Sequence, residues 1–169
     1  MSLKSLLKRN RVDARLLLDP GHFLSLGFGS GLSPFAPGTA GTLVAMPLYW
    51  LMSSLALPLY LGIVALMFGI GIYLCGRTTE RLGSHDHSAI VWDEVVGYLL
   101  TMTMVPVDWR WAVLGFFLFR LFDVWKPWPV RIMDRRIAGG LGIMLDDIGA
   151  AIYAAASLHA LIYFYPRIF

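Results

Sequence analysis

The stretch TLVAMPLYWLMSSLALPLYLGIVALMFGIGIYLC, residues 42–75, contains almost no charge and decides the fold class. It divides at Pro58 into two apolar runs, 42–57 and 59–75. Each run is slightly shorter than the roughly 20 residues that a helix needs to cross the hydrocarbon core, but aromatic residues near the ends can extend its reach into the interface. The stretch therefore predicts two membrane helices joined by a tight turn at the proline.

Three more apolar runs follow, at 95–107, 109–125 and 148–165, with a second turn expected near residue 107. The 169-residue chain is 57% hydrophobic and only 15% charged, whereas soluble domains are nearer a quarter charged. We therefore expect an all-α fold, a compact multi-pass helical membrane bundle with about four to five apolar helices. Whether the short run 95–107 spans the membrane stays open.

Charge placement predicts the orientation of this bundle. Residues 1–169 are expected to form one domain, with a basic N-terminal segment at 1–20 and a helical core at 21–165. The basic segment is either an amphipathic helix on anionic lipid or a solvated tail. If it is cytoplasmic, the arginine- and lysine-bearing segments 76–93 and 126–147 are cytoplasmic too, as the positive-inside rule requires. The polar loops then share one face of the membrane.

Acidic residues at the edges of the apolar runs are the first candidates for chemistry, because a carboxylate beside hydrocarbon is costly unless something binds it. An ordinary helix start or cap explains one aspartate of a pair, but not two. If the acids meet in space, their oxygens suit Mg²⁺. They are Asp93, Glu94, Asp123, Asp146 and Asp147.

The segment HDHSAIVWDE, residues 85–94, adds groups that exchange protons. Asp86 could supply another ligand or orient a water molecule. His85 or His87 could protonate a departing oxygen or bind a metal.

Two motifs offer groups for an anion. In FRLFDVWKPWPVR, residues 119–131, Arg120, Asp123 and Lys126 share one helix face, and Arg131 follows; a simple Arg–Asp ion pair is the alternative. The segment GFGSGLSPFAPGTAG, residues 27–41, is expected to be a loop because of its glycines and prolines. This loop either aims backbone N–H groups at an anion or lets backbones pack closely. Its candidate anion-binding residues are Gly29, Ser30, Ser33 and Thr39.

The single cysteine, Cys75, excludes an internal disulfide. With Arg81 it matches the C-x5-R spacing of cysteine-dependent phosphatases. Chance matches to this pattern are common, and no histidine precedes the cysteine. We therefore expect no catalytic role for it.

The four motifs GFGSGLSPFAPGTAGT, HDHSAIVWDE, FRLFDVWKPWPVR and GGLGIMLDDI, in this order, resemble the phosphatidylglycerophosphatase A family. The resemblance runs from about residue 20 to about residue 155. It implies a bacterial inner-membrane enzyme with its active site facing the cytoplasm. Such an enzyme uses Mg²⁺ to hydrolyse phosphatidylglycerophosphate to phosphatidylglycerol and inorganic phosphate.

Physical reasoning then assigns expected roles to these residues. Asp93, Glu94, Asp123, Asp146 and Asp147 would hold one or two Mg²⁺ ions; Asp93, Glu94, Asp123, Asp86 and His85 form the catalytic set. Substrate would bind to Lys126, Arg120, Arg131, Gly29, Ser30, Ser33 and Thr39. The expected partners are the lipid substrate and the bilayer, with no nucleic acid, and the sequence leaves the oligomeric state open.

Two other classes of protein remain as alternatives. A divalent-cation channel or transporter could use the same acids to line a pore, but it would spread them through the membrane depth. A phospholipid transferase that releases a nucleotide would carry the DGxxAR…GxxxDxxxD pattern, which is absent from the chain.

Overall fold

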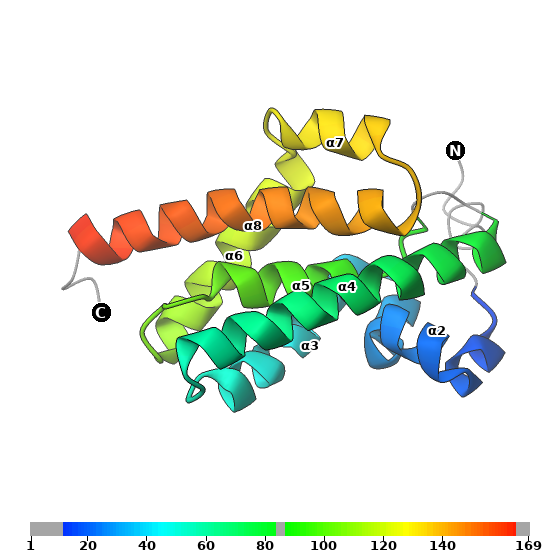
Figure 1. Ribbon diagram of the computed structural model, residues 1–169, viewed down its shortest axis with the longest axis horizontal. Helices are drawn as coiled ribbons and strands as arrows, with labels where there is room; N and C mark the ends of the chain where they lie inside the picture. Colours follow the sequence, from blue (N-terminus) through cyan, green and yellow to red (C-terminus); the bar gives the residue numbers. More distant parts are fainter. Residues whose placement is uncertain (1–11, 84–86, 165–169) are drawn as a thin grey trace.

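The computed structural model describes residues 12–83 and 87–164, and all regular structure within them is helical (Figure 1). The all-α expectation is therefore confirmed for the described part of the chain. The elements, in chain order, are η1 (Ala14–Leu18), α2 (Pro20–Ser25), η2 (Gly27–Leu32), α3 (Pro37–Met52), α4 (Leu57–Leu82), α5 (Trp92–Thr101), α6 (Trp109–Trp125), α7 (Val130–Arg136) and α8 (Gly139–Phe164).

The turn expected at Pro58 separates α3 from α4. Helix α4 begins at Leu57, with the proline in its first turn, where a missing N–H costs no helical hydrogen bond. The other expected turn separates α5 from α6, and α6 covers the predicted run 109–125 without change. These boundaries follow from local chemistry, which explains why the sequence predicts them well.

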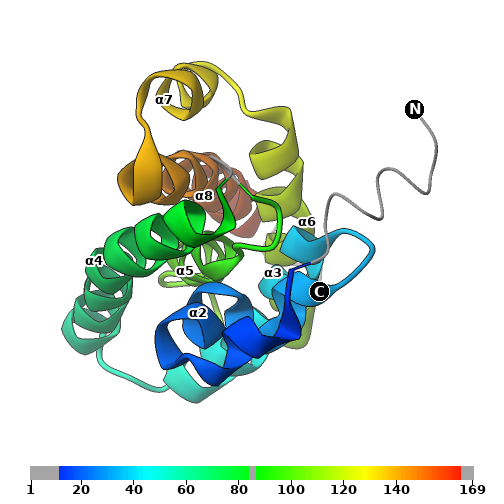
Figure 2. The same ribbon diagram turned by 90° about the vertical axis from the view of Figure 1, so that its right-hand side faces the viewer.

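Helix α5 lies at the centre of the bundle, surrounded by α3, α4, α6 and α8 (Figure 2). It has only 10 residues, which is about 15 Å of helix and too short to cross a membrane. Its side chains are buried on all sides, and Val95, Val96 and Leu99 are fully inaccessible. The Trp92 indole N–H anchors its first turn by donating to the Met67 carbonyl of α4 at 3.0 Å.

Helix α8 begins nine residues before the expected run 148–165, so Asp146 and Asp147 lie inside the helix and do not open it. The reason is its packing against α4. A Cβ atom on Gly140 would lie 1.9 Å from the Ile72 carbonyl oxygen. Only glycine permits this approach, which lets the glycine-rich segment continue as helix beside α4.

The segment 27–41 also differs from the loop that was expected. Residues Gly27–Leu32 form a kinked 3-10 helix with positive φ at Phe28 and Gly29, and α3 begins at Pro37. The close-packing alternative is observed in this segment. A Cβ on Gly31 would lie 1.9 Å from the Ala89 carbonyl oxygen, and one on Gly41 would lie 2.7 Å from Val91 Cβ.

Two described helices, α4 and α8, are long and apolar enough to cross a membrane. Helix α4 supports this reading better, because only 22% of its most apolar window is buried, against 56% for α8. Helices α3 and α6 have 16 and 17 residues. The expected bundle of four to five spans is therefore not confirmed, and most of the basic N-terminal segment lies outside the described residues.

Candidate active site

A cavity of about 270 Å³ lies where the N-terminal ends of α3 and α5, the C-terminal end of α6 and the N-terminal part of α8 meet. All five acids that the sequence singled out line it, together with two of the predicted cations. The expected convergence of distant acids is therefore observed. The lining residues are Ala36, Pro37, Gly38, Ser88, Ile90, Asp93, Glu94, Arg120, Asp123, Lys126, Asp146 and Asp147.

Three of these acids form a cluster suited to a cation. Asp93 and Glu94 lie in the first turn of α5 and Asp147 lies on α8, and each offers a carboxylate oxygen within 4.8 Å of the others. Asp93 Oδ1, Glu94 Oε2 and Asp147 Oδ2 are buried, and no described group donates a hydrogen bond to them. Because unpaired buried carboxylates are costly and hard cations prefer oxygen ligands, this donor set fits Mg²⁺.

The pKa shifts of the clustered acids also favour a bound cation. Burial raises the pKa of Asp93 well above its ordinary value, and the nearby charge of Glu94 raises it further. Burial, and then the charge of Asp147, raises the pKa of Glu94 to about 8. These carboxyl groups therefore repel one another when ionised, and a cation between them would favour the ionised form.

Arg120 connects two of the acids across α5 and α6. Its Nη1 lies 2.5 Å from Asp123 Oδ2, one helical turn away, and 3.7 Å from Glu94 Oε1. The Arg–Asp pair that the sequence offered as an alternative is thus present. With about a fifth of its side chain exposed, Arg120 keeps a positive charge at the wall of the cavity.

Lys126 gives the cavity a second cation. It ends α6 with φ of 47°, an unusual left-handed conformation for a lysine. Its Nζ contacts Asp146 Oδ2 at 2.5 Å. The adjacent aspartates of α8 therefore have different partners: Asp146 contacts Lys126, whereas Asp147 belongs to the acidic cluster.

The sequence interpretation named Thr39 in the first turn of α3 but not its neighbour Gly38, which contacts two residues of the site. A Cβ atom on Gly38 would lie 2.2 Å from Glu94 Oε1 and 3.0 Å from Arg120 Nη1. Only a glycine lets α3 approach these two side chains so closely. The Pro37–Gly38 pair, a favourable helix start, is the signal that could have identified this turn.

Several predicted residues lie away from the cavity lining. Arg131 is exposed, and its guanidinium contacts the Trp125 carbonyl at 3.5 Å. Ser30 and Ser33 donate to their own segment, to the carbonyls of Gly27 and Phe35.

Two further predicted substrate-binding residues are also absent from the lining. Gly29 makes a turn, with φ of 92°. Thr39 follows Gly38 in α3 but is not among the residues that line the cavity. His85 and Asp86 lie outside the described residues.

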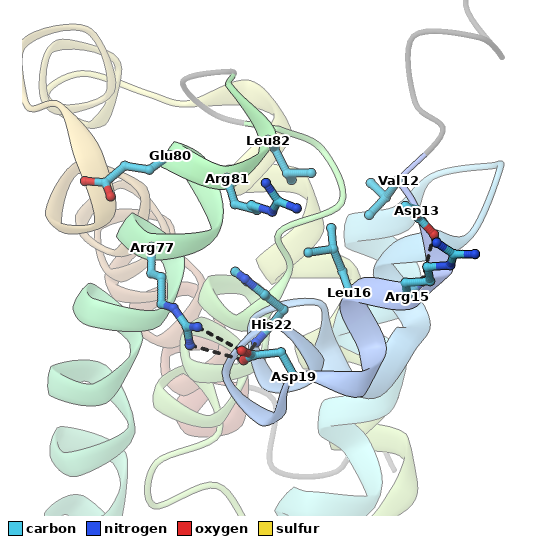
Figure 3. Close-up of a pocket in the computed structure, with 10 residues that line it drawn as sticks. All are labelled: Val12, Asp13, Arg15, Leu16, Asp19, His22, Arg77, Glu80, Arg81 and Leu82. Carbon is cyan, nitrogen blue, oxygen red and sulfur yellow. Dashed lines mark hydrogen bonds and ion pairs between the residues drawn. The ribbon is translucent and has the colours of Figure 1, made fainter.

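A larger cavity, about 870 Å³, lies between the η1–α2 segment and the C-terminal end of α4 (Figure 3). Its acids and cations are mixed, and Arg77 donates two hydrogen bonds to Asp19, at 2.8 and 3.1 Å. It lacks the clustered carboxylates of the smaller cavity. Cys75 is fully buried, with its sulfur 3.9 Å from that of Met144, so the C-x5-R match forms no accessible thiol site.

The fold and the smaller cavity together define a class: a protein whose described residues form an all-helical fold, with two helices of membrane length and a cavity that brings five acids together with two basic side chains. Comparison with known proteins agrees. The phosphatidylglycerophosphatase A family model matches residues 23–162. A phosphatidylglycerophosphatase A from Escherichia coli (strain K12) is 48% identical over 149 residues, covering 88% of this chain and 87% of its own length.

Two further relatives support the same conclusion. A phosphatidylglycerophosphatase A from Haemophilus influenzae is 46% identical, covering 87% of this chain and 91% of its own. A protein from Bacteroides thetaiotaomicron, named provisionally as a phosphatidylinositol-3-phosphatase, is 38% identical, covering 78% and 86%. No solved structure matches. The chain belongs to the phosphatidylglycerophosphatase A family, and it is therefore a phosphatase.

Proposed function

We propose that this protein hydrolyses phosphatidylglycerophosphate to phosphatidylglycerol and inorganic phosphate, with Mg²⁺ held by Asp93, Glu94 and Asp147. The substrate comes from the names of its relatives. The observation that carries the metal assignment is the cluster of three carboxylates from two helices, within 4.8 Å of one another and with buried, unpaired oxygens. Asp123 and Asp146 would complete or position this set through their ion pairs.

The reaction breaks the bond between phosphorus and the glycerol oxygen and forms one between phosphorus and a water oxygen. Bound Mg²⁺ would neutralise the phosphate and lower the pKa of a coordinated water. Arg120 and Lys126 would hold the non-bridging oxygens, where charge-assisted hydrogen bonds are strongest. The departing glycerol oxygen needs a proton, and His85 stays the predicted donor, with Asp86 predicted to orient the water.

We place the reaction at the cytoplasmic face of the bacterial inner membrane. Helix α4 exposes large apolar side chains along its length, among them Leu59, Leu66 and Ile70, and lipid would cover these at no solvation cost. The N-terminal part of α8, which lines the cavity, packs against the C-terminal part of α4 through Gly140. This part of α4 carries Arg77 and Arg81, so it is the cytoplasmic end by the positive-inside rule. The lipid headgroup could then enter the cavity while its acyl chains stay in the bilayer.

Phosphate release from purified protein in detergent tests this proposal. We expect release from phosphatidylglycerophosphate that stops with EDTA and returns with added Mg²⁺. Release that persists in EDTA would contradict the metal assignment, and the absence of release in Mg²⁺ would contradict the substrate. Phosphatidic acid and a phosphatidylinositol 3-phosphate measured in parallel would give the selectivity among lipid phosphomonoesters.

The channel and transferase alternatives have separate tests. The five acids that line the cavity lie together instead of following the membrane depth, which favours an enzyme over a pore. Liposomes containing the protein should show no cation flux, and incubation with CDP-diacylglycerol should release no CMP.

A further inference from the structure

One side of α6 carries a stripe of large apolar side chains that the described helices leave uncovered. Its members lie four, three and one residues apart, so at 100° per residue they fall within a sector of about 100° around the helix axis. Each of these residues is between 54% and 76% exposed. They are Phe117, Leu121, Val124 and Trp125, which we call the α6 stripe. A contiguous exposed apolar surface of this kind marks contact with lipid or with another molecule.

The α6 stripe borders the carboxylate-lined cavity. Arg120 and Asp123 line that cavity from the adjacent side of the same helix. Val124 follows Arg120 by four residues, and side chains at this spacing are neighbours on a helix surface. The mostly exposed Val124 therefore lies beside the mostly buried Arg120. A ligand whose polar group contacts Arg120 in the cavity would have the rest of its structure within reach of the stripe.

Two indole rings extend this surface beyond the end of α6. Trp125 ends the helix, and Trp128 lies in the short connection to α7 and is exposed. Contacts from α8 hold both in place: the Tyr153 hydroxyl donates to the Trp128 carbonyl at 2.7 Å, and the Phe122 ring stacks on the rings of Trp125 and Tyr153. The indoles are therefore exposed although their surroundings are ordered. Tryptophan in such a position is typical of the layer between hydrocarbon and headgroups.

The order of side chains along α6 matches the order of layers in one leaflet of a bilayer. The apolar residues come first, the indoles follow, and then come the cations Lys126, which lines the cavity, and Arg131, which is exposed. The eight residues from Phe117 to Trp125 span about 12 Å of helix. Half of the roughly 30 Å hydrocarbon core is of nearly the same length. An anionic phospholipid beside α6 would thus place its acyl chains on the stripe and its phosphate at the cations.

We propose that the α6 stripe, together with Trp128, is the surface on which the acyl chains of the lipid substrate lie while its terminal phosphate enters the cavity. This inference rests on the proposed function and adds the part of the protein that recognises the apolar part of the substrate. Its consequence is selectivity: the protein should bind a phosphomonoester carried by a membrane lipid more tightly than the same phosphomonoester without acyl chains.

The first test compares Leu121→Gln with Leu66→Gln in the full chain, purified in detergent with Mg²⁺. Both changes replace an exposed leucine of an apolar helix, but Leu66 is on α4 and does not line the cavity. We measure kcat and KM for phosphatidylglycerophosphate, with KM as a mole fraction in the micelle, and KM for its deacylated headgroup. Leu121→Gln should raise the lipid KM on the order of tenfold, because an apolar contact is lost.

The other constants serve as the controls. For Leu121→Gln, kcat for the lipid and KM for the headgroup should stay at their wild-type values, as expected when a contact made equally in the ground state and the transition state is removed. Leu66→Gln should change none of the constants. Equal lipid KM values in the two variants would overturn the inference. An equal rise of both KM values in Leu121→Gln would also overturn it, because the substitution would then act on the cavity itself.

A second test identifies what covers the stripe and needs no hydrolysis. A nitroxide is attached to Phe117→Cys in a protein whose Cys75 is alanine, reconstituted in phosphatidylglycerol vesicles, with Glu80→Cys as the exposed control. The label at 117 should collide more with oxygen, which concentrates in hydrocarbon, than with a water-soluble nickel chelate, and the label at 80 should show the reverse.

Two results at position 117 would overturn the inference. A label that collides mainly with the nickel chelate would mean that water covers the stripe. Low collision with both reagents would mean that protein covers it, and spectral broadening from a second nitroxide would identify that protein as another copy of the chain. Lipid contact at 117 in a wild-type protein that releases no phosphate from the lipid would instead contradict the proposed function alone, so the two failures are distinguishable.

Discussion

At the scale of single residues, substitutions in the acidic cluster test the proposed metal site most directly. Asp147→Asn should abolish Mg²⁺-dependent phosphate release, because it removes the charge of a buried carboxylate that lies against Asp93 and Glu94. The protein should stay folded and membrane-bound, since the substitution also relieves repulsion between buried acids. Phosphate release and a melting curve in detergent measure the two outcomes.

The matched control for this change is Glu80→Gln. Glu80 is an exposed acid on α4 that lines the larger cavity instead of the carboxylate-lined one, so its neutralisation should leave activity near the wild-type level. If the Asp147→Asn protein kept its activity, Asp147 would not be a ligand of the metal.

Gly38 provides a residue-scale prediction that the acids do not. A methyl group in Gly38→Ala would lie 2.2 Å from Glu94 Oε1 and must displace that carboxylate. Because displaced supporting groups commonly cost about 10–100-fold in metal affinity, the Mg²⁺ concentration for half-maximal thermal stabilisation should rise by roughly that factor. Gly62→Ala is the control, since a Cβ there meets nothing within 4 Å. Equal Mg²⁺ dependence in the two variants would show that Gly38 does not position Glu94.

At the scale of helices, the sequence predicted elements well where local chemistry sets them. Pro58 and Asp108 mark helix starts, and the Asp108 side chain accepts from the Arg110 N–H at 2.8 Å. The sequence predicted helices poorly where glycines allow two backbones to pack closely. Residues 37–41 were expected to belong to a loop and residues 139–147 to precede the last apolar run. Both segments are helical because their backbones lie against α5 and α4. The sequence alone does not show which neighbouring helix approaches a glycine, so it does not distinguish a glycine in a loop from a glycine in a closely packed helix.

The contact between α4 and α8 gives an element-scale prediction. Gly140→Ala places a methyl group 1.9 Å from the Ile72 carbonyl oxygen, so the two helices must move apart. Overpacking of this kind costs about 1–3 kcal/mol, and the melting temperature in detergent should fall. Gly69→Ala is the comparison, because a Cβ there contacts nothing within 4 Å and alanine favours helix over glycine. A melting temperature unchanged by Gly140→Ala would mean that the helices do not cross so closely.

At the scale of the whole molecule, the sequence predicted which residues belong to the site but not which of them contact each other. Polar residue types beside apolar runs identified all five acids, Arg120 and Lys126, because charge in such surroundings needs a reason. The pairing within the set could not be read from spacing. Adjacent Asp146 and Asp147 take different partners because α8 packs against both α5 and α6, so that Asp147 meets the acids of α5 and Asp146 meets Lys126 at the end of α6.

Orientation in the membrane is the last whole-molecule prediction. The C-terminal end of α4, which carries Arg77 and Arg81, lies at the opposite end of that helix from the α3–α4 turn (Figure 1). The cavity lies at the N-terminal end of α3, about 24 Å from the same turn along the 16 residues of this helix. By the positive-inside rule the arginine-bearing end of α4 is cytoplasmic. A Cys75→Ala parent, whose buried cysteine is removed, should keep its activity and accept no thiol label.

Single exposed cysteines in this parent then report each end. Ser54→Cys, in the α3–α4 turn, should react in intact cells with a thiol reagent that does not cross the inner membrane. Arg81→Cys, at the end of α4, should react only after the membrane is permeabilised. The reverse pattern would place the cavity on the outer face, where a substrate made inside the cell could not reach it. Equal labelling of both positions in intact cells would mean that α3 and α4 do not bring this turn to the opposite side of the bilayer from the cavity.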